Sequence, residues 1–198
     1  SKPDPIMSKS RQLLSVNTAA TQAITIQGRQ IMTGIGKRSV SDMERAQTVV
    51  VKPLGLEGDE QADLTVHGGL SKAVYAYPHE HYAFWQTVRS QAKAQDWNEP
   101  LPFGMLGENL TLTGLLEADA FIGDQLHFPD CVLAISEPRQ PCYKFEAVMG
   151  FKQAAKMMAQ SGYCGFYLSV IKPGSSLTSS AKPNFSRIGE GTAFAPVK

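Results

Sequence analysis

A stiff, cationic segment at positions 138–144 (PRQPCYK) contains the residue best suited to carry chemistry. Its two prolines restrict the backbone, and Arg139 and Lys144 flank Cys142. Neighbouring cations favour the thiolate form of a cysteine, which is the form that binds a metal or attacks a substrate. Cys142 is therefore the first candidate for a metal ligand or nucleophile. The alternative is an incidental surface thiol.

The other two cysteines have a different context. Cys131 begins the apolar run CVLAI, and Cys164 lies in YCGFY, so both are expected to fill the core. Three widely spaced cysteines predict neither a disulfide framework nor a zinc motif. This pattern is typical of a reduced, cytoplasmic chain.

A second candidate region is rich in glycine and acids. Residues 55–60 (GLEGDE) are followed by His67-Gly68-Gly69. Glycines let a backbone approach a ligand closely, and exposed N–H groups can bind an anion. Asp59 could orient this loop or supply a proton, and His67 could pair with Cys142. A turn-rich connection between strands would explain the same composition.

A third candidate region is FGMLGENL at positions 103–110. Glu108 and Asn109 stand at the start of an expected strand, where their donors and acceptors suit a polar ligand. Turn chemistry leading into the strand is the alternative explanation.

Several cations lie beside these motifs or beside Gly and Pro turns. A few of them gathered in space would hold a phosphate, whereas a scatter of solvated side chains is the alternative. They are Lys37, Arg38, Lys52, Lys72, Arg139 and Lys144.

The elements that must position these residues are mostly short strands. Alternation and turn signals predict strands at 22–26, 29–33, 47–51, 109–113, 124–128, 131–136 and 162–171. Helices are expected at 79–89 and 151–160, with a short third one after Cys142. Residues 1–10, 95–107 and 172–186 are expected to be loops. The fold class is therefore mainly β (α+β), such as a barrel with a few helices.

Overall composition limits the function classes. The 198 residues are 42% hydrophobic and 19% charged, with a formal net charge of +1. This balance predicts no nucleic-acid partner. No apolar run approaches the roughly 20 residues that span a bilayer, so no membrane partner is expected. The N-terminal residues do not have the pattern of a signal peptide.

The three motifs together resemble the MOSC domain family, and within it the YiiM-type proteins. The matching runs are 58–60 with 66–69, then 103–104 with 107–110, then 137–142. The resemblance covers residues 11–175, expected to form one domain. Residues 176–198 are expected to be an extension that packs on that domain or trails from it. The small C-terminal helical region of YiiM-type proteins is expected to be missing.

The resemblance implies a MOSC-type β-barrel that binds a molybdenum cofactor in its molybdopterin form. Cys142 would be the metal ligand, and Cys142, His67 and Asp59 would serve catalysis. The residues implied to bind the cofactor are Lys37, Lys52, His67, Gly68, Glu108, Asn109, Arg139 and Cys142. Thiolate is a soft ligand that suits such a metal.

The activity that the resemblance implies is reduction of N-hydroxylated compounds, including the detoxification of N-hydroxylated purine bases. The overall change is R–NH–OH + 2e⁻ + 2H⁺ → R–NH₂ + H₂O. The sequence has no ferredoxin-type cysteine set and no flavin or NAD fingerprint, so a separate reductase would supply electrons.

Two other functions stay open on the sequence. The chain could be a cofactor or sulfur carrier with a persulfide on Cys142, although nothing in it resembles the pyridoxal-phosphate domain of the sulfurases. It could also be a barrel that has lost its cofactor and acts through protein contacts alone.

Overall fold

A computed structural model describes residues 10–61 and 69–188. Most of its strands form one sheet, and their bounds are β1 (Gln12–Thr18), β4 (Arg38–Asp42), β7 (Val74–Pro78), β8 (Leu110–Thr113), β9 (Gln125–His127), β10 (Val132–Pro138), β11 (Phe166–Lys172) and β13 (Asn184–Ser186). The spatial order is β13-β9-β10-β11-β7-β8-β1-β4. All neighbours are antiparallel except β7 and β8, which are parallel. The expected sheet-dominated α+β class is confirmed.

A smaller sheet packs against the large one. Its strands are β5 (Val49–Lys52), β6 (Gly55–Leu56) and β12 (Gly174–Leu177), in the order β12-β5-β6. Val51 and Leu177 share a buried core cluster with Leu13 and Leu168 of the large sheet. The barrel expectation is corrected, because strands in the described ranges form these open sheets rather than one closed ring.

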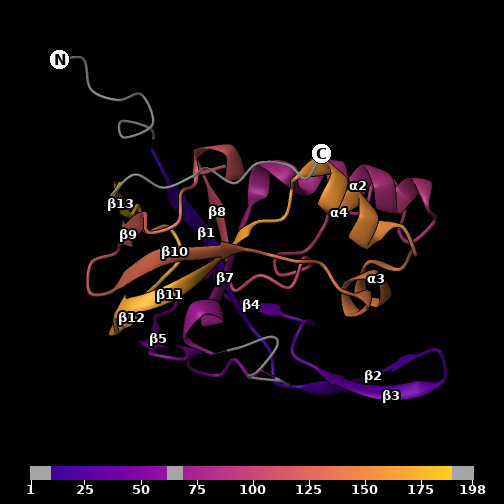
Figure 1. Ribbon diagram of the computed structural model, residues 1–198, viewed down its shortest axis with the longest axis horizontal. Helices are drawn as coiled ribbons and strands as arrows, with labels where there is room; N and C mark the ends of the chain where they lie inside the picture. The colour runs from indigo at the N-terminus through magenta and orange to yellow at the C-terminus, as the bar shows by residue number, and fades with distance from the viewer. Residues whose placement is uncertain (1–9, 62–68, 189–198) are drawn as a thin grey trace.

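The helices gather at one end of the molecule, away from β9 and β13 (Figure 1). The described chain also has three 3₁₀ turns, η1 (Leu70–Lys72), η2 (His79–His81) and η3 (Glu117–Asp119). The α-helices at this end are α2 (Tyr82–Gln91), α3 (Tyr143–Met149) and α4 (Ala154–Ser161). A second core cluster joins them to β7 and includes Tyr77, Trp85, Phe145 and Met158. No helix in the described part of the chain is long and apolar enough to cross a membrane.

The hairpin of β2 (Gln22–Ile26) and β3 (Arg29–Thr33) has the expected bounds. Gln27 and Gly28 form its turn with φ of 50° and 76°, the left-handed region that such a turn requires. The three expected helices are also present, and α4 ends at Gly162 with φ of 71°. In Figure 1 the hairpin extends from the body of the protein beneath α3.

Four strands of the large sheet, β1, β4, β7 and β13, were not expected. The strand β7 is buried at every position, so it lacks the alternation by which a strand is recognised. The expected loop at 172–186 is also corrected, because it contains β12 and β13. Their Ser-rich sequences carry little strand preference, and pairing with β5 and β9 makes them strands.

Gly165 lies immediately before β11, and substituting it tests how tightly the centre of the sheet is packed. Its φ is +65°, and an added Cβ would lie 2.5 Å from the Ala76 carbonyl oxygen. Gly28 has a similar φ of +76° but open space around it. Both Gly→Ala changes should cost about 1 kcal/mol for the left-handed backbone, and Gly165→Ala should cost roughly 1–3 kcal/mol more for the clash. Equal losses in urea unfolding would contradict this packing.

Candidate functional site

Five of the residues expected to form a site line one pocket. Its open volume is about 670 Å³, including the mouth. The five are Lys37, Asp59, Asn109, Arg139 and Cys142. They come from the segment after β3, the loop after β6, the start of β8 and the connection from β10 to α3, so the fold assembles the pocket from distant parts of the sequence.

Cys142 stands directly before α3, at the wall of this pocket. Its backbone is extended, and its carbonyl accepts the first hydrogen bond of the helix, from the Phe145 N–H at 3.0 Å. The thiol is free and half-buried. Cys142 is therefore fixed at the start of a helix, and it lines a pocket that a ligand can enter.

Arg139 is a buried charge at the same pocket. Its guanidinium donates to the Leu106 carbonyl and lies 4.8 Å from the centre of the Tyr75 ring and 4.9 Å from that of Phe145. Burial disfavours the charge, but the neighbouring Tyr75, Tyr167 and Cys142 groups leave the pKa of Arg139 above its ordinary value. Arginine stays charged in proteins, and among the described residues no carboxylate forms an ion pair with it. The pocket therefore carries a positive charge that an anion would neutralise.

Lys37, Asp59 and Asn109 form a hydrogen-bonded brace along the pocket wall. The Lys37 Nζ lies 2.9 Å from the Asp59 Oδ1, and these side chains are only 8% and 3% exposed. Asp59 also accepts from the Ala19 N–H at 3.0 Å and, through Oδ2, from the Asn109 Nδ2 at 2.9 Å. The Asn109 Oδ1 in turn accepts from the Tyr75 N–H at 3.0 Å. The close partners of Asp59 are all donors, so this carboxylate positions its neighbours.

Two more lysines line the pocket. The Lys72 Nζ lies 3.3 Å from the Glu137 Oε1, and the Lys144 Nζ donates to the Met32 carbonyl at 3.3 Å. Four of the six candidate cations are therefore gathered. The other two, Arg38 and Lys52, are exposed and do not line it.

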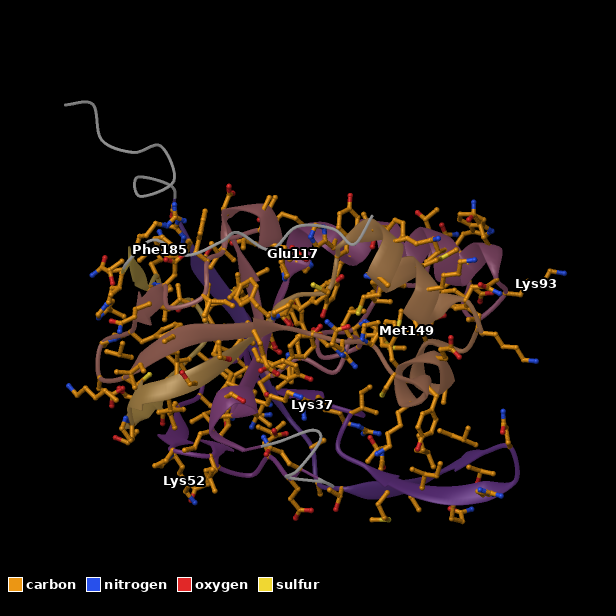
Figure 2. All side chains as sticks on the ribbon, viewed as in Figure 1. Lys37, Lys52, Lys93, Glu117, Met149 and Phe185 are labelled. Carbon is orange, nitrogen blue, oxygen red and sulfur yellow. The ribbon has the colours of Figure 1, made fainter. Side chains whose placement is uncertain are left out.

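The expectation that Lys52 binds a cofactor at this site is corrected. Its Nζ lies 3.2 Å from the Glu57 Oε1, and both side chains are 56% exposed. Figure 2 shows Lys37 near the centre of the molecule and Lys52 at its periphery. Lys52 is the last residue of β5, beside Pro53, and its side chain points to solvent.

The expectation that Glu108 binds the cofactor is also corrected, because this residue lies beneath the pocket wall and does not line the pocket. Its carboxylate is fully buried and accepts from the Gly104 N–H at 2.8 Å, the Leu106 N–H at 3.1 Å, the Thr111 hydroxyl at 3.0 Å and the Tyr82 hydroxyl. Burial raises the pKa of Glu108 above its ordinary value. By ordering this turn, Glu108 holds the Leu106 carbonyl that receives Arg139.

Two predicted residues, His67 and Gly68, lie outside the described residues. Within the described ranges no group of three or more His, Cys, Asp or Glu side chains could hold a metal. Asp59 is engaged by Lys37, and Glu60 accepts from the Thr21 N–H and hydroxyl.

Two aromatic residues of the pocket were not identified from the sequence. Tyr75 and Tyr167 line it with ring centres 5.1 Å apart, and the Tyr75 hydroxyl donates to the Cys164 carbonyl at 2.5 Å. Burial raises the pKa of Tyr75 well above its ordinary value, so it presents a neutral ring. Neither belongs to a motif, and only the pairing of β7 with β11 brings them together.

The brace predicts strong coupling between Lys37 and Asp59. Removing either charge leaves the other buried without its partner, so Lys37→Met and Asp59→Asn should each cost about 3 kcal/mol of unfolding free energy. The double variant should cost clearly less than the two losses together. The exposed pair Lys52 and Glu57 is the control, with a coupling below about 1 kcal/mol. Additive losses at Lys37 and Asp59 would contradict the brace.

The thiols should differ in reactivity. Burial raises the pKa of Cys131 and of Cys164 to about 11, so at about pH 8 only roughly one in a thousand of each is ionised. Cys142, at the pocket wall, should be the site that iodoacetamide modifies in the folded protein. Mass spectrometry of wild type and Cys142→Ser measures this. Equal modification of all three thiols would contradict it.

Comparisons with known proteins identify the family of this chain. The model of the MOSC domain family matches residues 63–191. "Uncharacterized protein YflK" of Bacillus subtilis is 40% identical over 162 residues, which cover 82% of this chain and 67% of that protein. Protein YiiM of Escherichia coli is 37% identical over 126 residues, covering 64% of this chain and 54% of its own length. A Gibberella moniliformis protein named "Reductase" is 35% identical over 123 residues, covering 61% of this chain and 20% of that protein.

A solved structure gives the same result. YiiM from Geobacillus stearothermophilus superposes with a TM-score of 0.67 at 28% identity, covering 89% of this chain and 75% of that one. The chain thus spans about two thirds of YflK and about half of Escherichia coli YiiM. The family match extends over more than half of the chain and includes Arg139 and Cys142. The protein belongs to the MOSC domain family.

Proposed function

We propose that this protein binds a molybdenum-containing pterin cofactor, with Cys142 as its thiolate ligand, and reduces N-hydroxylated compounds. One observation carries the proposal: the Cys142 thiol and the buried Arg139 guanidinium line the same pocket, and Arg139 has no carboxylate partner in the described residues. Membership of the MOSC family and the relative named "Reductase" support it.

The residues present fit such a cofactor. A thiolate is a soft ligand of the kind that molybdenum takes, and the gathered cations suit a terminal phosphate. The rings of Tyr75 and Tyr167 line the pocket and offer apolar contact to a pterin.

Each residue has a distinct task in this proposal. The cofactor, when bound, would supply the two-electron and oxygen-transfer chemistry of R–NH–OH + 2e⁻ + 2H⁺ → R–NH₂ + H₂O. Cys142 binds the metal, and Arg139 and Lys72 bind its anionic groups. Asp59 acts as a positioning residue, because it holds Lys37 and Asn109 in place. In this proposal a separate reductase supplies the electrons.

Elemental analysis tests the proposal. Wild type from a host that makes the cofactor should contain about one molybdenum per chain and reduce N-hydroxyadenine with a chemical electron donor. Cys142→Ser should lower turnover by at least about 100-fold, because the metal loses its protein ligand. Arg139→Gln should lower the molybdenum and phosphorus content several-fold, and Arg139→Lys, which keeps the charge, should lower it less.

Lys52→Met is the control, since this cation lies away from the pocket. Wild type without molybdenum, or Cys142→Ser with full metal and full turnover, would contradict the proposal. Metallated protein without turnover, but with sulfane sulfur on Cys142, would instead indicate a sulfur carrier.

A further inference from the structure

His81 and Glu117 form a buried pair that the proposed function does not use. His81 lies in η2 and Glu117 in η3, and neither lines the Cys142 pocket. In Figure 2 Glu117 lies above the strand β10, and the pocket residue Lys37 lies below it. The His81 Nε2 lies 2.8 Å from the Glu117 Oε1, and the two side chains are only 10% and 7% exposed. A buried polar pair with satisfied hydrogen bonds holds its surroundings in one arrangement.

The pair holds residues 163–165, the segment that leads into β11. The Glu117 Oε2 accepts a hydrogen bond from the Gly165 N–H at 3.2 Å. The His81 ring stacks on the Tyr163 ring, with centres 3.8 Å apart and an angle of 8° between the planes. Both ends of the segment are therefore attached to the pair. An added Cβ on Gly165 would lie 2.5 Å from the backbone of β7, so the segment is also packed tightly against that strand.

The carbonyl groups of this segment accept hydrogen bonds from two tyrosines of β7. The Tyr77 hydroxyl donates to the Tyr163 carbonyl at 2.7 Å, and the Tyr75 hydroxyl donates to the Cys164 carbonyl at 2.5 Å. The Tyr75 ring lines the pocket, and its centre lies 4.8 Å from the Arg139 guanidinium. The segment therefore fixes the outer end of the Tyr75 side chain, and the ring of this side chain supports the buried charge of Arg139.

The same segment also contacts the backbone of Arg139. Pro138 pairs with Phe166 at the end of the ladder between β10 and β11, so Arg139 follows directly beside the segment. Burial raises the pKa of Cys164 to about 11, and a hydrogen bond from the Arg139 N–H to this thiol opposes the rise. Arg139 is thus held at its backbone and at its guanidinium by groups that residues 163–165 position.

We infer that Glu117 and His81 are positioning residues for the anion site of Arg139, and that they act through residues 163–165. The inference rests on the proposed function, which assigns an anion to Arg139, and it adds two residues that lie outside the pocket. Neither of them touches the ligand. They set the affinity for the anion by holding the segment against which Tyr75 and Arg139 are placed.

Inorganic phosphate tests the inference without the molybdenum cofactor. Protein from a host that lacks the cofactor is treated with iodoacetamide at increasing phosphate concentrations, and mass spectrometry measures modification of Cys142. Phosphate should protect Cys142, because this thiol and Arg139 line one pocket. Glu117→Leu should raise the half-protecting phosphate concentration about tenfold, since residues that orient a binding group commonly have effects of this size. Glu117→Gln, which keeps an acceptor for the Gly165 N–H, should raise it less than about threefold.

A double variant guards against a failure to fold. Removing one member of a buried pair is more damaging than replacing both by apolar residues. His81→Phe combined with Glu117→Leu keeps a ring beside Tyr163 and removes the hydrogen bond to Gly165. It should show the same rise in the half-protecting phosphate concentration as Glu117→Leu alone.

Two controls separate positioning from a general loss of stability. Leu126→Ala opens a cavity in the other core cluster, on β9, and should destabilise the fold without changing protection by phosphate. All variants are compared at a temperature at which their unfolding curves show them folded. In the Arg139→Lys background Glu117→Leu should have a clearly smaller effect, because its action passes through the guanidinium.

Wild-type protection by phosphate in folded Glu117→Leu, or in the folded double variant, would overturn the inference. The same rise in the Arg139→Lys background as in the Arg139 protein would also overturn it. Absence of protection in wild type would do so as well, because no anion site would then exist for the pair to position. These results do not depend on bound molybdenum, so elemental analysis of the wild type remains a separate test of the proposed function.

Discussion

The ion pair of Lys37 and Asp59 is the interaction on which the site depends. It is almost fully buried, and Asp59 extends it to Asn109 and the backbone of Ala19. Through these bonds the segments that follow β1, β3 and β6 are attached to Asn109, directly before β8. None of these segments would be held by the sheet alone, because each lies beyond the end of its strand. This pair joins them into the pocket wall, together with the hydrogen bonds of Glu60 to Ala19 and Thr21.

The pocket has two kinds of positive charge, one paired with a carboxylate and one without such a partner among the described residues. The Asp59 carboxylate neutralises Lys37, so Lys37 contributes more to the shape of the pocket than to its electrostatic potential. Arg139 stands among tyrosine and phenylalanine rings and donates to the Leu106 carbonyl. In a buried site an uncompensated charge acts strongly on a ligand, because little water screens it. If the pocket binds an anion as proposed, we expect its affinity to depend mainly on Arg139 and the shape of the pocket to depend on Lys37.

The sequence was informative where local chemistry decides the structure. The β2–β3 hairpin, the end of α4 at Gly162 and the helix after Cys142 each follow from turn residues or helix preferences nearby. Arg139 and Cys142 were recognisable for the same reason. The unexpected parts depend on partners distant in sequence: β7 is buried on both faces, and the Tyr82 hydroxyl donates to the buried Glu108 carboxylate. No local pattern distinguishes such a buried acceptor from a ligand-binding carboxylate.

The position of β1 in the sheet has a consequence for the order of assembly. This strand, near the start of the described chain, lies between β8 and β4, and β8 lies between β1 and β7. The pocket lining extends from Thr33 to Tyr167. Such distant pairings form slowly and only after their partners have been synthesised. During translation the ribosome must therefore release the chain beyond β11 before the pocket is complete, so a ligand finds all of its lining residues only after that point.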